Sequence, residues 1–277
     1  MIIKAPGRTR LRVLYDETAE RLMWDRVRGR ITRERLSRGA RARPPAVSPT
    51  AVLQTREESD DATSICRGLH LPMHPDRVKN WDTLGALSLI LEHLDTQHAR
   101  EASVAVLEAG AALYSSFLPA LALYRVPQLI GMGLEHKGTI RRGPVHFLSG
   151  DITETGLADG QFDAIGCLSV IEHGVPVEAF FRESARILRP GGLLVVSTDY
   201  DQDPPDTTGL TAYGEPVHIF SPTEILQLVE QAERAGLRLE GRLTFDHPSR
   251  PVHWYWTGLD YTFIRLTFRR KGRISAN

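Results

Sequence analysis

Along most of the chain, short apolar runs alternate with longer segments in which apolar residues recur every three or four positions. The first pattern predicts buried strands and the second predicts amphipathic helices. The expected helices cover residues 74–94, 114–124, 177–188 and 222–235, and the expected strands cover 103–107, 128–132, 145–148, 162–168, 193–198, 237–243 and 261–269. Strands that alternate with helices in this way predict an α/β fold with a parallel sheet and helices on its faces.

Two details refine the predicted sheet. Residues 189–192 read Arg-Pro-Gly-Gly, which predicts a tight turn before the strand at 193–198, because both glycines accept positive φ. No crossover helix lies between the last two expected strands, so the strand at 261–269 should run antiparallel to its neighbour. The pattern therefore predicts about seven strands, of which the last is antiparallel.

The N-terminal part of the chain follows a different pattern. Arginine is dense over residues 26–45, and apolar residues recur at roughly helical spacing over 22–31, which predicts an amphipathic helix. Two interpretations stay open: a basic arm for nucleic acid, lipid or a partner, or a solvated helix that packs on the main domain or on a second copy in a homodimer. Residues 46–61 are polar and contain proline, as in a linker. We therefore divide the chain into a helical extension with a linker, 1–75, and an α/β domain, 76–277.

Composition narrows the function classes without selecting one. The 277 residues carry 34 basic and 34 acidic side chains, so net charge favours neither nucleic acid nor an acidic partner. Cys66 and Cys167 lie far apart with no CxxC pair or histidine cluster, which signals neither a metal site nor a disulfide; Cys167 lies in an apolar run typical of a buried side chain. No apolar run approaches the roughly 20 residues that span a bilayer. We therefore expect a soluble, cytoplasmic protein with no membrane partner.

The residues that follow each expected strand are the first candidates for a binding site, because ligands of open α/β sheets bind at the carboxyl ends of the strands. These strand ends read, in chain order, Glu108-Ala109-Gly110, Gly131-Met132-Gly133, Gly150-Asp151-Ile152, "CLSVIEHG" (167–174) and "STDYDQD" (197–203).

Two long segments carry a resemblance to a known family. "GDITETGLADGQFDAIGCLSVIEH" (150–173) and "FFRESARILRPGGLLVVST" (180–198) look like the second half of the class I S-adenosylmethionine-dependent methyltransferases, and the resemblance covers residues 81–271. It implies a Rossmann-like sheet of seven strands, mostly parallel with an antiparallel last strand and helices on both faces. It also implies S-adenosyl-L-methionine as methyl donor and S-adenosyl-L-homocysteine as product.

The resemblance also implies which residues contact the donor. Glu108 and Gly110 match the start of the family's first motif, which lets the backbone approach the amino-acid end of the donor. Asp151 with Ile152 matches the adenine motif, and Leu168 with Ser169 matches the motif at the end of the fourth strand. The complete set of expected donor-binding residues is Glu108, Ala109, Gly110, Ala112, Tyr114, Ser115, Met132, Gly133, Asp151, Ile152, Leu168 and Ser169.

The chain departs from the family pattern at two places. The loop that usually carries further glycines reads Ala111-Ala112-Leu113, and the position of the acid that binds the ribose hydroxyls is Gly133. Ala112 is small enough for a close backbone approach, and polar contacts can come from the segment 114–116. Glu135, two residues past the expected acid, is the candidate for the ribose if the chain bulges there.

The expected catalytic residues lie after the fourth and fifth strands. His173 is a candidate base or acceptor-orienting group, and a helix-capping or backbone-bonding role stays open for it. The turn-rich segment 199–220 is expected to cover the site, and its Tyr200, Asp201 and His218, with Tyr213, are candidates for acceptor contact. Glu172 and the aromatic group at 253–256 are more typical of structural positions.

We therefore expect a methyltransferase that acts on a small-molecule or sugar acceptor in a biosynthetic pathway, with no metal, and with nucleic acid disfavoured as acceptor by the neutral charge. The alternative is a methyltransferase-like domain without methyl transfer, which binds a partner or catalyses another reaction in the same cavity. A cleft filled by Leu113 or Tyr114 would favour that alternative. A nicotinamide-dependent oxidoreductase is disfavoured, because "GAALYS" (110–115) lacks GxGxxG.

Overall fold

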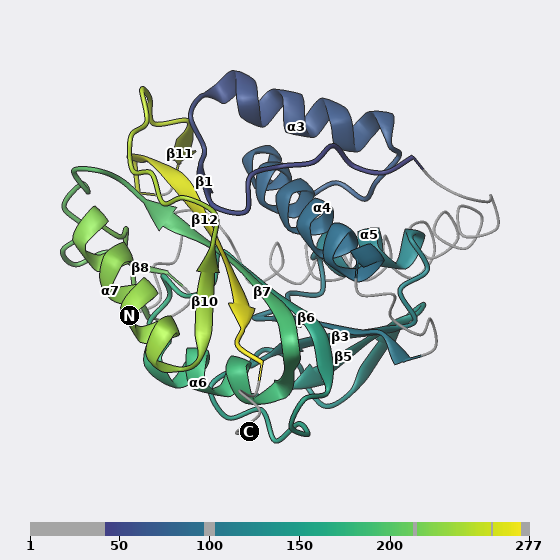
Figure 1. Ribbon diagram of the computed structural model, residues 1–277. Helices are drawn as coiled ribbons and strands as arrows, with labels where there is room; N and C mark the ends of the chain where they lie inside the picture. The colour runs from purple at the N-terminus through teal and green to yellow at the C-terminus, as the bar shows by residue number, and fades with distance from the viewer. Residues whose placement is uncertain (1–41, 97–102, 213–214, 256, 273–277) are drawn as a thin grey trace.

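The computed structural model describes residues 42–96, 103–212, 215–255 and 257–272. Within these ranges ten strands form one mixed sheet (Figure 1). The strands follow one another across the sheet in the order β1 (Ala51–Val52), β12 (Leu259–Arg270), β7 (Leu188–Tyr200), β6 (Phe162–Leu168), β2 (Ala105–Ala109), β3 (Gln128–Gly133), β5 (Val145–Ser149) and β4 (Ile140–Arg142), and β10 (Leu237–Glu240) and β11 (Val252–Trp254) also pair with β12.

The centre of this sheet is parallel and its strand order reverses once. β2, β3, β5, β6 and β7 pair in parallel, whereas β12 runs antiparallel to both β7 and β10. From β2 the chain moves outward through β3 to β5, then returns to the other side of β2 and moves outward through β6 to β7. The prediction of a mostly parallel sheet with an antiparallel last strand is confirmed. The reversal between β2 and β6 is where such a sheet opens a crevice at its carboxyl edge.

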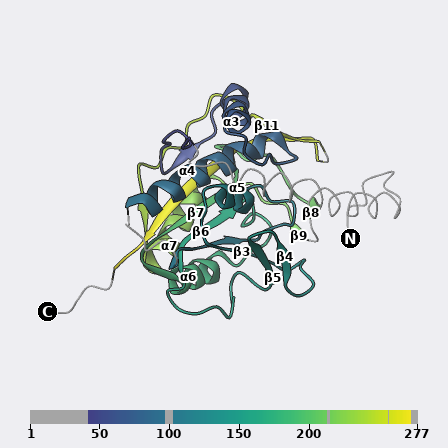
Figure 2. The ribbon, with the colours of Figure 1, turned by 90° about the vertical axis from the view of Figure 1, so that its right-hand side faces the viewer.

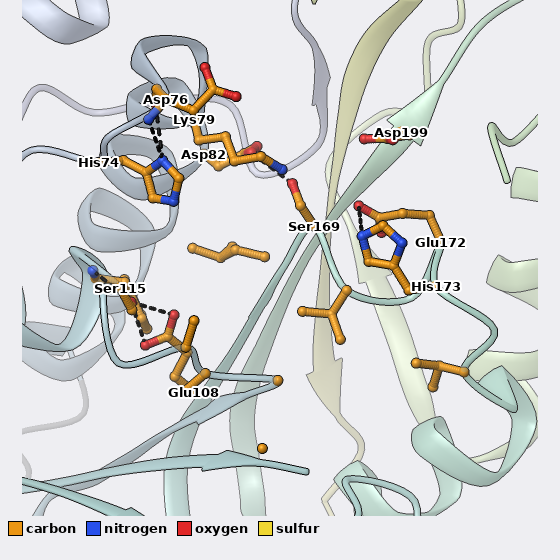
Figure 3. Close-up of a pocket in the computed structure, with 18 of the residues that line it drawn as sticks. His74, Asp76, Lys79, Asp82, Glu108, Ser115, Ser169, Glu172, His173 and Asp199 are labelled. Carbon is orange, nitrogen blue, oxygen red and sulfur yellow. Dashed lines mark hydrogen bonds and ion pairs between the residues drawn. The ribbon is translucent and has the colours of Figure 1, made fainter. Parts of the chain in front are cut away.

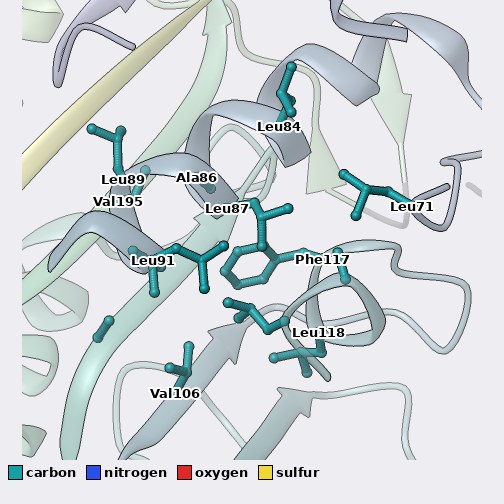
Figure 4. Packing of buried hydrophobic residues seen from close by; sticks show 14 of the residues in the cluster. Leu71, Leu84, Ala86, Leu87, Leu89, Leu91, Val106, Phe117, Leu118 and Val195 are labelled. Carbon is teal, nitrogen blue, oxygen red and sulfur yellow. The ribbon is translucent and has the colours of Figure 1, made fainter. Parts of the chain in front are cut away.

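Helices cover both faces of the sheet, as expected (Figures 1 and 2). One face carries α4 (Asn80–Thr96) and α5 (Phe117–Leu123), with α3 (Arg56–Gly68) lying over α4; the other carries α6 (Val177–Ile187) and α7 (Pro222–Arg234). The two layers have separate apolar cores. In the first, Leu87 of α4 packs with Phe117 and Leu118 of α5 above Val106 of β2 (Figure 4).

α4 is buried on nearly all sides because it lies between the sheet and α3. Its sequence is correspondingly apolar around most of the helix, which is the pattern of a core helix. The indole nitrogen Nε1 of Trp81 donates a hydrogen bond to Glu58 Oε1 of α3 at 2.7 Å and ties the two helices together. Burial on all sides fixes the first turn of α4, which contributes side chains to the site described below.

The expected linker at 46–61 is wrong. β1 extends the sheet beside β12, and α3 begins at Arg56 within the polar stretch. The side chain of Thr55 caps α3 by accepting a hydrogen bond from the backbone of Glu58, and the buried Ala62 and Cys66 lie on its inner side. A polar surface helix that buries only a few small residues has a weak apolar pattern, so the sequence reading missed it. The expected division of the chain at 75/76 stays a prediction.

Three further expectations about the elements need correction. The helix expected at 114–124 begins at Phe117, because the preceding residues form the loop described below. The expected turn at 189–192 lies inside β7, which begins at Leu188; the strand pairing with β6 shifts there and Gly191 has φ 82°. The seven expected strands are all present, and β1, β4 and β11 join them in the main sheet.

The arginine-rich segment lies almost wholly outside the described residues. The helix expected over 22–31, which was a candidate contact in a homodimer, also lies outside them. Cys66 and Cys167 are both buried free thiols, which confirms the reading of Cys167. Within the described ranges, no helix combines the length and the apolar character needed to cross a membrane.

Candidate functional site

A cavity of about 850 Å³ opens at the carboxyl ends of β2, β3, β6 and β7, at the point where the strand order reverses (Figure 3). This volume falls within the range of small-molecule sites. Two groups of residues face each other across it. We call the loop after β2 and the neighbouring strand ends (108–116, 133–135 and 150–153) the loop side, and we call Lys79, Asp82, Glu172, Asp199 and Tyr261 the acid side.

The loop side begins with a turn that only glycine can make. Gly110 has φ 77°, and a Cβ there would come within 2.5 Å of the Val170 methyl groups. The next residue, Ala111, donates its backbone N–H to the Met132 carbonyl oxygen at 2.8 Å. Ala112 and Tyr114 line the cavity, whereas Leu113 packs against the apolar core. The loop therefore leaves the cleft open although it lacks the family's further glycines.

Glu108 lies buried at the end of β2 beneath this loop. Its two carboxylate oxygens accept hydrogen bonds from the Ser115 hydroxyl at 2.6 and 2.7 Å, and Ser115 Oγ accepts one from the Phe117 backbone at 3.2 Å. Burial raises the pKa of Glu108 to about 7, although the Ser115 hydrogen bond opposes the shift. The short helix α5 thus starts from a serine that is held by the carboxylate.

Gly133 stands at the expected place of the ribose-binding acid, and the structure explains why no side chain fits there. A Cβ at this position would lie 2.9 Å from the Ala111 carbonyl oxygen. Glu135 follows two residues later, lines the cavity and is exposed. On the neighbouring strand end, Asp151 Oδ1 accepts hydrogen bonds from the backbone and hydroxyl of Thr153 at 2.8 and 2.7 Å. Two acids therefore stand on the rim where the loop side opens.

Most of the expected site residues meet in this cavity. The residues that line it are Glu108, Gly110, Ala112, Tyr114, Ser115, Gly133, Asp151, Ile152, Leu168, Ser169 and His173. Ala109 and Met132 do not, because both side chains are buried inside the sheet with 2% exposure.

His173 is the one expected catalytic residue that lines the cavity. Burial, together with the charge of Lys79, lowers its pKa to about 4, so the imidazole is neutral at pH 7. Its Nε2 lies 4.0 Å from Glu172 Oε1. A neutral imidazole at a cavity wall is able to accept a proton.

The structure places the other three expected catalytic residues away from the cavity. The Tyr200 hydroxyl donates to the Phe245 carbonyl oxygen at 2.9 Å, and the ring is fully buried in the core. Asp201 accepts two hydrogen bonds from Arg250 at 2.7 and 2.8 Å. His218 pairs with Glu224 at 3.0 Å. Since β7 continues to Tyr200, the alternation of side chains sends Asp199 to the cavity and Tyr200 to the opposite face. Tyr213 lies outside the described residues.

The sequence reading missed most of the acid side. Asp82 in the first turn of α4 is 1% exposed and accepts a hydrogen bond from the Ser169 hydroxyl at 3.3 Å. Asp199 at the end of β7 is 3% exposed and adjoins Tyr261. Burial raises the pKa of Asp82 to about 6 and that of Asp199 to about 7, in both cases against the opposing charge of Lys79.

Glu172 and Lys79 complete the acid side. Glu172 is 1% exposed and accepts a hydrogen bond from the Thr198 hydroxyl at 2.9 Å; burial raises its pKa well above the usual value, and the charge of Asp199 adds to that shift. Lys79 ends the 3-10 turn η2 (Arg77–Lys79) just before α4. Burial opposes its charge, but Asp199 and Glu172 outweigh burial and raise its pKa. The strand-end rule could have found Asp199, whereas Lys79 and Asp82 precede the first parallel strand.

Comparison with known sequences bears on this site directly. Residues 121–196 match the family model of a methyltransferase domain. The match begins within α5 and ends within β7. This segment is therefore similar to a methyltransferase domain. It contains β3, β5, β6 and α6, and it includes the strand end with Leu168, Ser169 and His173.

The chain is also similar to a demethylmenaquinone methyltransferase from Beutenbergia cavernae, with 38% identity over 65 residues. That match spans 24% of this chain and 27% of the relative, so it covers about a quarter of the relative's length.

Solved structures with a similar fold include the following three. A Haemonchus contortus phosphoethanolamine N-methyltransferase 2 in complex with S-adenosyl-L-methionine is 12% identical, with 66% of this chain and 52% of that chain covered and a TM-score of 0.45. The YcgJ protein of Bacillus subtilis is 17% identical, with 65% and 99% covered and a TM-score of 0.46. The [4+2]-cyclase SpnF is 15% identical, with 82% and 100% covered and a TM-score of 0.45.

Proposed function

We propose that this protein binds S-adenosyl-L-methionine on the loop side of the cavity and transfers its methyl group to a small-molecule or sugar acceptor. The observation that carries the proposal is the open cavity at the strand-order reversal, which the loop after β2 borders without filling. Leu113, one of the residues that would have indicated a blocked cleft, packs into the core instead. The alternative of a domain without methyl transfer therefore gains no support from the cavity.

The residues of the loop side fit this donor. Gly110 allows the backbone to approach the amino-acid end of the donor, because no Cβ occupies that position. Glu135 is the acid in reach of the ribose hydroxyls, since Gly133 admits no side chain. Asp151 with Ile152, and Leu168 across the cavity, are assigned to the adenine. The donor supplies a methyl group on a positively charged sulfur.

His173 and the acid side are assigned to the acceptor. The acceptor atom must lie in line with the methyl group and lose any proton that it carries. His173 is neutral at pH 7 and lines the cavity, so it is a candidate for that proton. The biosynthetic role and the cytoplasmic location expected from the sequence stay predictions.

Calorimetric titration of the full chain with S-adenosyl-L-homocysteine tests the proposal. We expect micromolar binding, and Asp151→Ala should weaken it by about tenfold, because a hydrogen bond to a charged group contributes about 1.5 kcal/mol. Asp206→Ala is the matched control: Asp206 also accepts a hydrogen bond from the backbone two residues on, at 2.9 Å, but it does not line the cavity. A folded chain that binds neither S-adenosyl-L-methionine nor S-adenosyl-L-homocysteine would contradict the proposal.

A further inference from the structure

The acid side carries buried oxygen atoms that lack a partner. Asp82 Oδ1 and Asp199 Oδ1 have no hydrogen-bond partner, although both carboxylates are almost fully buried and both residues line the cavity. Buried polar atoms in folded proteins are nearly always paired, because an unmade hydrogen bond costs the full desolvation of the group. Glu172 Oε1 also has no hydrogen-bond partner, and the nearest ring nitrogen of His173, Nε2, lies 4.0 Å from it. Because Asp82, Asp199 and Glu172 all line the cavity, a ligand bound at this wall is the candidate source of the missing donors.

The charges on the acid side are also unbalanced. Lys79 is the only lysine or arginine that lines the cavity in the described part of the chain. The carboxyl groups whose charges act on it are Asp199, Glu172, Asp82 and Asp76. Arg265, which is buried and does not line the cavity, adds a second positive charge that acts on Asp82, and burial favours the neutral form of Glu172. Two cations beside four carboxyl groups still leave this wall acidic, which favours a further positive charge.

Aromatic side chains flank the same region. Tyr261 adjoins Asp199, and Trp254 and Tyr255, on and just after the neighbouring strand β11, also line the cavity. Aromatic faces together with carboxylates are the groups that proteins use to hold organic cations. The described residues offer no cluster of histidine, cysteine and acid side chains able to hold a metal ion, so the chemistry of this wall points to an organic cation.

We propose that the methyl acceptor is an amine, which binds as its ammonium ion to Asp199 and Asp82. This inference rests on the proposed function and names the substrate class for the same cavity. The loop side and the acid side lie at different ends of the cavity, with Glu108 and Ser115 at one end and Asp199 and Glu172 at the other (Figure 3). The donor on the loop side and the amine on the acid side can thus be held at the same time.

The transfer is balanced in atoms and charge. The bound ammonium first gives one proton to a carboxylate of the acid side, which leaves a neutral amine with a lone pair. Burial raises the pKa of Asp199 to about 7, close to the operating pH and therefore suited to accept this proton. The lone pair then forms the N–C bond, and the electrons of the C–S bond stay on sulfur. The products are a methylated ammonium ion and S-adenosyl-L-homocysteine, whose sulfur is a neutral thioether.

The test uses the full chain with acceptors that differ only in the reacting group. The two pairs are benzylamine against benzyl alcohol, and glucosamine against glucose. With S-adenosyl-L-methionine present, formation of S-adenosyl-L-homocysteine is measured; with S-adenosyl-L-homocysteine present, binding of each compound is measured by calorimetry. We expect binding and turnover with an amine, at least tenfold above its alcohol. Turnover of alcohols alone, or no binding of any amine to the donor-product complex, would overturn the inference.

Two isosteric variants connect the result to the residues. Asp199→Asn and Asp82→Asn should each lower amine binding by tenfold or more and leave the affinity for S-adenosyl-L-homocysteine within twofold, whereas Asp206→Asn should change neither. A thermal melt shows whether either variant is unfolded. If one of the two aspartate variants is unfolded, binding is compared with the other. Loss of S-adenosyl-L-homocysteine affinity in both would show that these acids hold the donor, which overturns the inference.

The two proposals fail in different ways. If the unaltered chain does not bind S-adenosyl-L-homocysteine, the proposed function fails. If it binds S-adenosyl-L-homocysteine and methylates only alcohols, the function stands and the amine inference alone is wrong.

Discussion

The loop side and the acid side of the cavity are built in different ways. The loop side comes from short segments that directly follow parallel strands, so its residues are close together in the sequence. The acid side joins Lys79 and Asp82, which precede the first parallel strand, to Glu172, Asp199 and Tyr261, which come from three later segments. Local motifs therefore reveal the loop side, whereas only the assembled sheet reveals the acid side. Substitutions on each side should therefore have separable effects.

Gly110→Ala should abolish donor binding, with a loss of at least about a hundredfold in affinity, because a methyl group there collides with Val170 in a backbone conformation that L-residues avoid. Gly138→Ala is the matched control: Gly138 has the same φ of 77°, and a Cβ there meets nothing within 4 Å. Titration with S-adenosyl-L-homocysteine measures both. Equal losses in the two variants would show that backbone strain alone, and not the contact with Val170, is responsible.

His173→Asn should lower kcat by about a hundredfold, because the imidazole orients the acceptor beside the methyl group, and leave the affinity for S-adenosyl-L-homocysteine within twofold. His218→Asn should leave both unchanged, since His218 pairs with Glu224 outside the cavity. Methyl-transfer rates with the best acceptor measure the difference. A larger loss in His218→Asn than in His173→Asn would contradict the assignment of the cavity residues.

The acid side should make the unliganded protein less stable as pH rises from about 5 to 8. Burial raises the pKa of Asp82 to about 6 and of Asp199 to about 7, above the values of exposed carboxyls, while Lys79 opposes both shifts and Glu172 and Tyr261 adjoin Asp199. The folded state thus binds more protons than the unfolded state in this range, so stability is lost as pH rises through the folded pKa values.

Asp199→Asn should flatten that dependence, by about 2 to 3 kcal/mol between pH 5 and 8, because one shifted carboxyl is removed. Urea denaturation at several pH values measures the free energy of unfolding of both proteins. A stability that rises with pH in the unaltered protein, or an equal slope in the variant, would contradict the assignment of Asp199 as a buried, raised carboxyl.

Thr55→Ala should give the smallest effect. It removes the cap of α3 and should lower the free energy of unfolding by about 1 kcal/mol. The affinity for S-adenosyl-L-homocysteine should stay unchanged, because no residue of α3 lines the cavity. Thermal melts and titration check the two halves of this prediction, and a loss of affinity would mean that α3 helps to position Lys79 and Asp82.

The same contrast explains how far the sequence led. The alternation of apolar patterns predicted the sheet, the antiparallel β12 and the positions of α6 and α7, because each follows from local periodicity. The apolar pattern did not predict α3, because the inner side of that helix buries mostly small residues. It also placed the start of α5 too early, because the residues before Phe117 form the loop in which Ser115 bonds Glu108. The sequence showed that the expected acid is missing at Gly133 and offered Glu135 in its place. Only the structure shows why no acid fits at Gly133: the Ala111 carbonyl oxygen lies too close.

For the acceptor, the sequence reading favoured residues beyond Asp199 in the segment 199–220. The extra length of β7 changed which of them reach the cavity: Asp199 does, whereas Tyr200 turns into the core and Asp201 is held by Arg250. Strand ends are defined by tertiary pairing with β12, which a local pattern does not contain.

A crystal structure of the full chain with S-adenosyl-L-homocysteine tests the central claim most directly. We expect the ligand to lie against the backbone of residues 110–112, with its ribose beside Glu135 and its adenine beside Asp151 and Ile152. We expect Asp82 and Asp199 to make no contact with it. Binding of the ligand's ammonium group by Asp199, or its absence from the cavity at saturating concentration, would contradict the account.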